Sequence, residues 1–315
     1  SGFLIVYMYY DKVAPARDWL QKYFTNRFAR IYPVYFLLLT ITVLLQHDFR
    51  PLFLLKNYTL THALVYNLKD VAIQPSWSLT VEECFYFFAP LIMLIARRYH
   101  FFKSLLLGIA LLLGALLITR ANITLLRTPL FVFRSTFFGH FLEFYAGMFV
   151  ALLALRRDKT GAAVRSGAVF TIAGGAGAAV VIAVLLYLNA VQTTVNPFVP
   201  VLINNFILPI PIAILYYGLI SEKTLASRFL SSWLLGLLGR TSYSFYLVHM
   251  LVIDYLAMPW LLKYFGVHYN LFVLATYLLA QLAALVLFLL FEEPLNIYIR
   301  KKFKPRRKAA VVAAG

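Results

Sequence analysis

Two adjacent carboxylates, Glu82 and Glu83, stand where a polar segment passes into a long apolar run, in the stretch PSWSLTVEECFYFFAP (75–90). An ionised side chain within an apolar membrane segment usually faces a polar cavity or a cationic partner. Because successive residues of a helix point about 100° apart, at most one of the two faces a given cavity. We expect Glu82 to orient an arginine or a substrate hydroxyl or to accept a proton, unless both acids are solvated charges that a helix N-terminus favours.

Two arginines, Arg27 and Arg30, are three residues apart, which places them on one face of a helix. Guanidinium groups form forked, charge-assisted hydrogen bonds with phosphate oxygens, so the pair is a candidate site for a phosphate-rich anion. The alternative is that both arginines anchor their helix at the lipid headgroups of the cytoplasmic side.

His249 lies on an apolar segment that also carries Ser242, Ser244 and Tyr246. A histidine can take a proton from a hydroxyl group near neutral pH, so His249 is a candidate base. Asp254 is a weaker candidate for its partner. The alternative is that His249 only supports a polar cavity within the membrane.

A second histidine, His140, is three residues before Glu143, and we expect the two to form a structural hydrogen bond. The His and acidic residues of the chain show no spacing of a known zinc motif, so no metal site is expected. The single cysteine, Cys84, excludes an internal disulfide.

The elements that carry these residues are continuously apolar. The chain has 315 residues and a mean hydropathy of +0.80, and 13% of its residues are charged, against about a quarter in a soluble domain. Apolar runs of membrane-spanning length predict an all-α, polytopic membrane helix bundle with eight full spans and one partial span over residues 1–10. The full spans are expected at 28–46, 82–96, 104–119, 136–155, 168–188, 199–220, 242–258 and 270–291. The small residues of 167–184 predict close helix packing.

The positive charges are unevenly distributed between the loops. Alternate loops carry 22 of the 29 lysines and arginines, namely 11–30, 97–103, 156–165, 221–240 and the tail. This bias predicts that these loops are cytoplasmic, with residues 300–315 as a basic tail at anionic headgroups. Arg27 and Arg30 would then lie at the inner mouth of their helix, the two glutamates on the outer side, His249 near the middle and Asp254 nearer the outside. We expect no nucleic-acid binding, because no aromatic residues are interleaved with the basic ones.

Six motifs occur in order along the chain. They are SGFLI (1–5), RFARIYPVY (27–35), PSWSLTVEECFYFFAP (75–90), FYAGM (144–148), GRTSYSFYLVH (239–249) and FEEP (291–294). Together they resemble the membrane-bound acyltransferase family 3, which includes the O-acetyltransferases of bacterial surface polysaccharides. The resemblance covers essentially the whole chain and defines a transmembrane domain over residues 1–299.

The resemblance implies about ten helices, an acyl-coenzyme A donor and an acceptor sugar hydroxyl on the outer side. Arg27 and Arg30 would bind the donor, and His249 and Glu82 are the candidate catalytic residues. Trp77, Glu83 and Asp254 would line the acceptor cavity, although Trp77 could instead be an interfacial anchor. The family's first helix carries an arginine and an essential histidine that have no counterpart here. We therefore expect the domain to be N-terminally incomplete, with its base upstream of Ser1.

These expectations describe an enzyme of the bacterial inner membrane with a cytoplasmic C-terminus. It would move an acyl group, acetyl in the first instance, from acyl-CoA as co-substrate to a hydroxyl of lipopolysaccharide O-antigen or another exopolysaccharide. No bound cofactor is expected, and the expected partners are membrane lipids and a glycan or lipid-linked saccharide. Two alternatives stay open, a secondary transporter or flippase built from inverted repeats and a catalytically silent truncated homologue.

Overall fold

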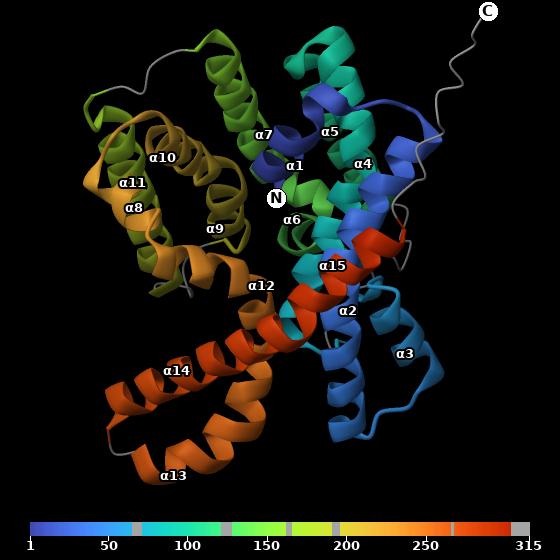
Figure 1. Cartoon of the computed structure of the whole chain (residues 1–315), viewed down its shortest axis with the longest axis vertical. Coiled ribbons are helices and arrows are strands. Elements are labelled where there is room, and N and C mark those ends of the chain that lie inside the picture. The colour runs from blue at the N-terminus through green and yellow to red at the C-terminus, as the bar shows by residue number, and fades with distance from the viewer. Residues whose placement is uncertain (65–70, 121–127, 162–165, 191–195, 266–267, 304–315) are drawn as a thin grey trace, which may run out of the picture. The chain divides into compact units, whose positions relative to one another are not determined.

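The computed structural model describes residues 1–64, 71–120, 128–161, 166–190, 196–265 and 268–303, and these residues form helices and their connections, with no β-strand (Figure 1). Eight helical segments in this part of the chain are long and apolar enough to cross a membrane. The predicted all-α, polytopic bundle and its eight full spans are confirmed, and helix α1 (Gly2–Tyr9) coincides with the predicted partial span.

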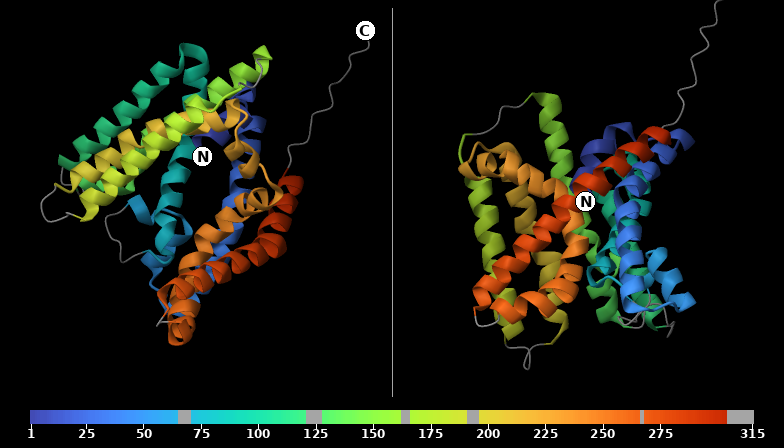
Figure 2. Two further views of the ribbon diagram at one scale, coloured as in Figure 1. Left: turned by 90° about the vertical axis from the view of Figure 1, so that its left-hand side faces the viewer. Right: turned by 60° about the horizontal axis from the view of Figure 1, so that its bottom comes forward.

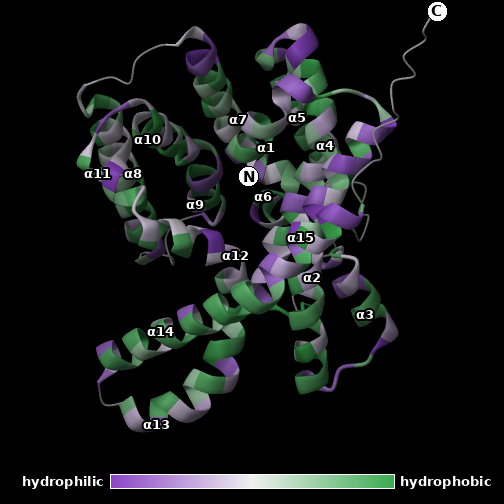
Figure 3. Cartoon of the chain, in the orientation of Figure 1, coloured by the Kyte–Doolittle hydropathy of each residue, from purple (hydrophilic) through white to green (hydrophobic). Residues whose placement is uncertain are grey.

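The eight spans consist of single helices or of helices joined end to end. They are α2 (Arg17–Gln46), α4 (Trp77–Tyr99), α5 (Phe101–Arg120), α6 (Pro129–Ser135) with α7 (Phe137–Thr160), α8 (Val169–Ala190), α9 (Phe198–Leu202) with α10 (Pro209–Ser221), α12 (Trp233–Val252) with α13 (Leu262–Phe265), and α14 (Tyr269–Leu287) with α15 (Glu293–Lys302). Two short helices, α3 (Pro51–Tyr58) and α11 (Leu225–Leu230), were not predicted from the sequence. Figure 3 shows the apolar character along α14.

Three π-helical segments, Ile203–Ile207, Ile253–Leu261 and Phe288–Glu292, join helices within single spans. Each contains or is closely followed by a proline, which lacks the backbone N–H that a regular α-helix needs. In these segments the backbone amide bonds the carbonyl five residues earlier instead of four. An example is the bond from the amide of Leu208 to the carbonyl of Ile203 (3.0 Å). Such turns are frequent at functional sites.

Three predicted helix starts are wrong, and one of them is that of α12, which begins at Trp233 rather than at residue 242. Helix α2 begins at Arg17 rather than at residue 28, so Arg27 and Arg30 lie in its third and fourth turns. Helix α4 begins at Trp77 rather than at 82, which places Glu82 and Glu83 in its second turn. Hydropathy marks only the apolar part of a helix, whereas its hydrogen bonds continue through polar turns. The interpretation of both acids as N-terminal charges of α4 therefore does not hold.

The predicted tail is partly helical. Helix α14 continues through the π-helical segment Phe288–Glu292 into α15, which ends at Lys302. Residues 300–302 are thus the last turn of a helix, where positive side chains are favoured by the helix dipole. Residues 304–315 lie outside the described residues.

The contacts within the chain group the helices into two compact units. Unit 1 consists of Ser1–Val13 and Phe49–Arg240, and unit 2 consists of Ala14–Asp48 and Thr241–Gly315. Unit 1 contains helices α1, α3 to α11 and the first turns of α12. Unit 2 contains α2, most of α12, and α13 to α15.

Within unit 1, α8 and α10 lie side by side as a hairpin with very close backbones (Figure 2). A Cβ atom on Gly174 would lie 2.2 Å from the backbone nitrogen of Leu215, and one on Gly218 would lie 2.4 Å from that of Thr171. Only glycine fits at these two positions. The close packing predicted for 167–184 is therefore present, with α10 as the partner.

The hairpin is closed by the carboxylate of Glu222, which follows α10 and is buried. Its two oxygens accept hydrogen bonds from the amides of Phe170 and Thr171 (2.9 Å each), and Oε2 also accepts one from the Thr171 hydroxyl (2.7 Å). These amides belong to the first turn of α8, where they have no partner within the helix. A negative charge there is also favoured by the helix dipole.

A buried polar network holds the segment that leads into α4. The Asn57 carboxamide bonds the amide of Ala72 (3.0 Å) and the carbonyl of Phe53 (2.9 Å). The Ser76 hydroxyl donates to the carbonyl of Ile73 (2.6 Å), so it accepts from Nε2–H of His62 (3.1 Å). This network positions the first turn of α4, and with it Trp77.

Candidate functional site

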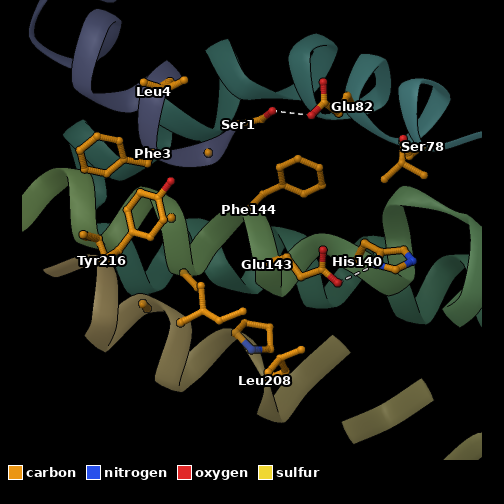
Figure 4. A pocket seen from close by; sticks show the side chains of 18 of the residues that line it. Ser1, Phe3, Leu4, Ser78, Glu82, His140, Glu143, Phe144, Leu208 and Tyr216 are labelled. Carbon is orange, nitrogen blue, oxygen red and sulfur yellow. Dashed lines mark hydrogen bonds and ion pairs between the residues drawn. The ribbon is translucent and has the colours of Figure 1, made fainter. Parts of the chain in front are cut away.

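Unit 1 contains a cavity of about 710 Å³ between α1, α4, α7 and the α9–α10 span (Figure 4). Most of its wall is apolar, with side chains such as Phe144, Leu208 and Ile212. The polar and aromatic-polar lining residues are Ser1, Trp77, Ser78, Glu82, His140, Glu143, Asn204 and Tyr216. A mostly apolar cavity of this size with a few convergent polar groups is typical of a small-molecule site.

The first polar group in the cavity is built around Glu82 of α4. Its Oε1 accepts a hydrogen bond from the Ser1 hydroxyl (2.6 Å), and its Oε2 accepts one from the hydroxyl of Tyr86 (3.0 Å), one turn further along the helix. The two hydroxyls are 3.1 Å apart. Both oxygens of Glu82 are thus engaged as acceptors, as suits an ionised carboxylate.

The second polar group is a pair on α7. Nδ1 of His140 lies 2.7 Å from Oε1 of Glu143, and Nε2 lies 3.2 Å from the carbonyl oxygen of Arg134. Because a carbonyl can only accept, Nε2 carries a hydrogen. The side chain of His140 is 11% exposed and that of Glu143 is 39% exposed, and both residues line the cavity.

The break between α6 and α7 makes this arrangement possible. Thr136 has an extended backbone there, and α6 ends at Ser135. The last carbonyls of a helix have no partner within it, so the carbonyls of Phe133 and Arg134 are free for other donors. Nε2–H of His140 donates a hydrogen bond to the carbonyl of Arg134. The side-chain amide of Asn205 donates one to the carbonyl of Phe133 (2.6 Å).

Some of the predicted site residues of unit 1 line the cavity and others do not. Glu82 and Trp77 line the cavity, and the Trp77 ring lies 6.0 Å from that of His140. Glu83 is not part of the lining, because it points away from Glu82 around the helix. The sequence interpretation recognised the pairing of His140 with Glu143 but missed that both line the cavity with Glu82. Figure 4 shows the two polar groups with the ring of Phe144 drawn between them.

Unit 2 contains a separate buried polar cluster. The hydroxyl of Ser244 donates to Oε2 of Glu292 (2.5 Å), both residues are buried, and the guanidinium of Arg30 interacts electrostatically with this carboxylate. The hydroxyl of Tyr243 bonds the carbonyl of Ile31 (2.8 Å), next to Arg30 in α2. Arg27 is buried on the same helix. Sequence reasoning did not single out Ser244 or Glu292 for this role.

The side chain of His249 forms a hydrogen bond within its own helix. Its Nδ1 lies 3.2 Å from the carbonyl of Phe245, and its ring stacks on the Phe245 ring at 5.8 Å. Nδ1 therefore carries the hydrogen in the neutral ring, which leaves Nε2 as an acceptor. Asp254 is exposed and lies on the π-helical segment that follows α12. Among the described residues, no group of three His, Cys, Asp or Glu side chains could hold a metal ion.

A comparison with protein families decides the class of the protein. The family model of an acyltransferase domain matches residues 1–303. The chain belongs to acyltransferase family 3. Searches of the curated proteins and of the solved structures gave no match.

Membership of acyltransferase family 3, together with the eight spans, makes the protein an integral membrane acyltransferase. This class favours the enzyme over a transporter. For an acyltransferase of family 3, the site must hold an acceptor group, remove its proton and stabilise the charge that develops on the carbonyl of the donor. The cavity of unit 1 offers carboxylate oxygens that accept hydrogen bonds from hydroxyl groups.

Proposed function

We propose that this family 3 acyltransferase transfers an acyl group, acetyl in the first instance, from cytoplasmic acyl-CoA to a hydroxyl of a cell-surface glycan. Lipopolysaccharide O-antigen and exopolysaccharide are the leading acceptors, and a lipid-linked saccharide would serve in the same way. The enzyme works in the bacterial inner membrane, with its C-terminus in the cytoplasm. The charge bias of the loops supports this orientation.

The observation that carries the proposal is the hydroxyl binding at Glu82. The carboxylate accepts hydrogen bonds from the hydroxyls of Ser1 and Tyr86 within the cavity. A sugar hydroxyl is the same chemical group, and it could enter this hydrogen-bond cluster by replacing one of the two. The aromatic face of Trp77, which also lines the cavity, suits an apolar face of a sugar ring.

The reaction transfers the acyl group from the sulfur atom of coenzyme A to the hydroxyl oxygen of the acceptor. The hydroxyl oxygen of the acceptor forms a bond with the thioester carbonyl carbon, the bond between that carbon and sulfur breaks, and the coenzyme A thiolate leaves. The hydroxyl proton passes through a base and ends on the thiolate, so the products are an ester and free coenzyme A. Positioning both substrates can lower the barrier by several kcal/mol.

The donor side of the proposal concerns Arg27 and Arg30. Coenzyme A carries phosphates, and guanidinium groups are well suited to bind them. Arg30 already interacts with the carboxylate of Glu292, and Glu292 is bonded to Ser244.

The test uses purified protein in liposomes, labelled acetyl-CoA and glycan extracted from a strain that lacks its own acyltransferase. We expect Arg30→Ala to raise the apparent KM for acetyl-CoA roughly 10- to 100-fold, because a hydrogen bond between charged groups is lost. Arg228→Ala, which removes an exposed arginine of α11, is the matched control and should leave KM unchanged. The double variant Arg30→Ala/Glu292→Gln avoids an uncompensated buried charge. An unchanged KM in both stable variants would remove Arg30 from the donor site.

A further inference from the structure

We infer that Asn204, oriented by its neighbour Asn205, binds a hydroxyl group of the acceptor through its side-chain oxygen Oδ1. The inference rests on the proposed function and adds a second hydroxyl-binding residue to the acceptor site, in addition to Glu82. Neither asparagine takes part in proton transfer, because a carboxamide offers only a hydrogen-bond acceptor oxygen and a donor NH₂ group.

The π-helical segment Ile203–Ile207 brings the two asparagine side chains together. Its backbone hydrogen bonds span five residues, so each turn holds more residues than an α-helical turn. Adjacent side chains therefore diverge by less than the roughly 100° of an α-helix. Nδ2 of Asn204 lies 3.0 Å from Oδ1 of Asn205. Asn204 lines the cavity, whereas Asn205 is buried and is not part of the lining.

The surroundings of Asn205 determine which end of each carboxamide is nitrogen and which is oxygen. One end of Asn205 faces two backbone carbonyl oxygens, that of Phe133 at 2.6 Å and that of Gly139 at 3.3 Å. A carbonyl oxygen only accepts hydrogen bonds, so this end is the NH₂ group. The other end is Oδ1, which also only accepts, so the atom of Asn204 that faces it is Nδ2. The break between α6 and α7 thus orients both carboxamides.

One polar atom of Asn204 is left for a ligand. Its Nδ2 is bonded to Asn205, and its Oδ1 has no hydrogen-bond partner among the residues that the structure describes. This oxygen can bind only a group that donates a hydrogen, which a hydroxyl does and a phosphate or thioester oxygen does not. Asn205 is thus a positioning residue, whereas Asn204 contacts the acceptor.

The two hydroxyl-binding residues together indicate the class of acceptor. Glu82 on α4 accepts hydrogen bonds from hydroxyl groups, and Asn204 on the α9–α10 span adds an acceptor oxygen to the wall of the same cavity. A ligand that satisfies both carries at least two hydroxyl groups on one small framework. A saccharide has this chemistry, and an acceptor with a single hydroxyl could satisfy only one of the two.

The experiment compares Asn204→Leu with Asn204→Asp in the full-length protein in liposomes, with labelled acetyl-CoA and extracted glycan. Leucine has nearly the same shape as asparagine but no acceptor oxygen. We expect Asn204→Leu to raise the KM for the glycan roughly 2- to 12-fold, the range for one neutral hydrogen bond, with kcat and the KM for acetyl-CoA nearly unchanged. Asn204→Asp keeps an oxygen for the hydroxyl, so its KM for the glycan should be lower than that of Asn204→Leu.

Thermal unfolding of the same variants separates binding from packing. Asn204→Asp replaces an N–H donor by a carboxylate oxygen that faces Oδ1 of Asn205, so it should unfold at a lower temperature than Asn204→Leu. The less stable variant is thus expected to bind the glycan better, an order that a purely structural role would not produce. Asn196→Leu is the matched control. It removes an asparagine that bonds the amide of Phe198 but does not line the cavity, and it should leave both KM values unchanged.

The outcomes are distinguishable. A wild-type protein that acetylates the glycan while Asn204→Leu keeps its KM would overturn the inference and leave the proposed function standing. A KM for the glycan that is higher in Asn204→Asp than in Asn204→Leu would show that Asn204 only supports the fold, and it would overturn the inference as well. A wild-type protein that acylates no hydroxyl acceptor would overturn the proposed function and this inference together.

Discussion

Alanine at Gly174 should destabilise the protein, whereas alanine at the neighbouring Gly175 should not. A Cβ atom at 174 would lie 2.2 Å from the backbone nitrogen of Leu215 and 2.5 Å from its Cα. A Cβ atom at 175 would meet nothing within 4 Å. The two substitutions are chemically identical and differ only in whether they face α10.

The expected change in the free energy of unfolding follows from these distances. Ordinary contacts between such atoms start near 3.4 Å, so α8 and α10 would have to move apart by about 1.2 Å at Gly174. The obstructing atoms belong to the backbone of Leu215 and cannot rotate away. Overpacking of this kind costs about 1–3 kcal/mol. At Gly175, alanine should be neutral or gain up to about 1 kcal/mol, because it loses less conformational entropy in a helix than glycine.

The assay is thermal unfolding of the two purified variants in the same detergent. We expect Gly174→Ala to unfold at a lower temperature than the wild type and Gly175→Ala at the same or a slightly higher one. Gly174→Ala should also raise the KM for the glycan, because α10 supplies Ile212 and Tyr216 to the cavity wall. Equal unfolding temperatures for the two variants would show that α8 does not pack on α10 in this way.

Two further predictions concern the polar networks of unit 1. Burial lowers the pKa of His62 from 6.5 to about 4, so the folded protein should lose stability as the pH falls from about 6.5 to 4, by up to about 3 kcal/mol. His62→Gln should abolish this part of the pH dependence in thermal unfolding, and an unchanged slope would contradict the burial of a neutral His62. Glu222→Ala should cost about 1.5–3 kcal/mol, because the first amides of α8 lose a charged acceptor. Hydrogen exchange at Phe170 and Thr171 should rise in this variant, and protection equal to that of the wild type would refute the capping role.

The cavity and the packing predictions are connected through α7 and α10. Helix α7 carries His140 and Glu143, and the α9–α10 span supplies Asn204 and Leu208 to the same cavity. The π-helical segment that precedes α10 places the side-chain amide of Asn205 against the carbonyl of Phe133 in α6 and that of Gly139 in the first turn of α7. A change at Asn205 should therefore affect the orientation of the site without touching the substrate.

The sequence by itself determined the class of fold and much of its packing. In lipid every backbone N–H and C=O must be satisfied within the chain, so long continuous apolar runs can only become helices, and the eight spans followed from hydropathy. The pairing of His140 with Glu143 followed from their spacing on a helix. The close approach of 167–184 to another helix followed from its small residues, although the sequence did not name α10 as that helix.

Only the tertiary structure decided which residues share a site. Ser1 directly precedes α1, Glu82 lies on α4 and Glu143 lies on α7, and no periodicity within one helix shows that all three line one cavity. Helix starts at Arg17 and Trp77 also escaped prediction, because hydropathy does not detect the polar turns of a helix. The hydrogen bond between Ser1 and Glu82 joins segments that are 81 residues apart, and such a contact exists only in the folded chain.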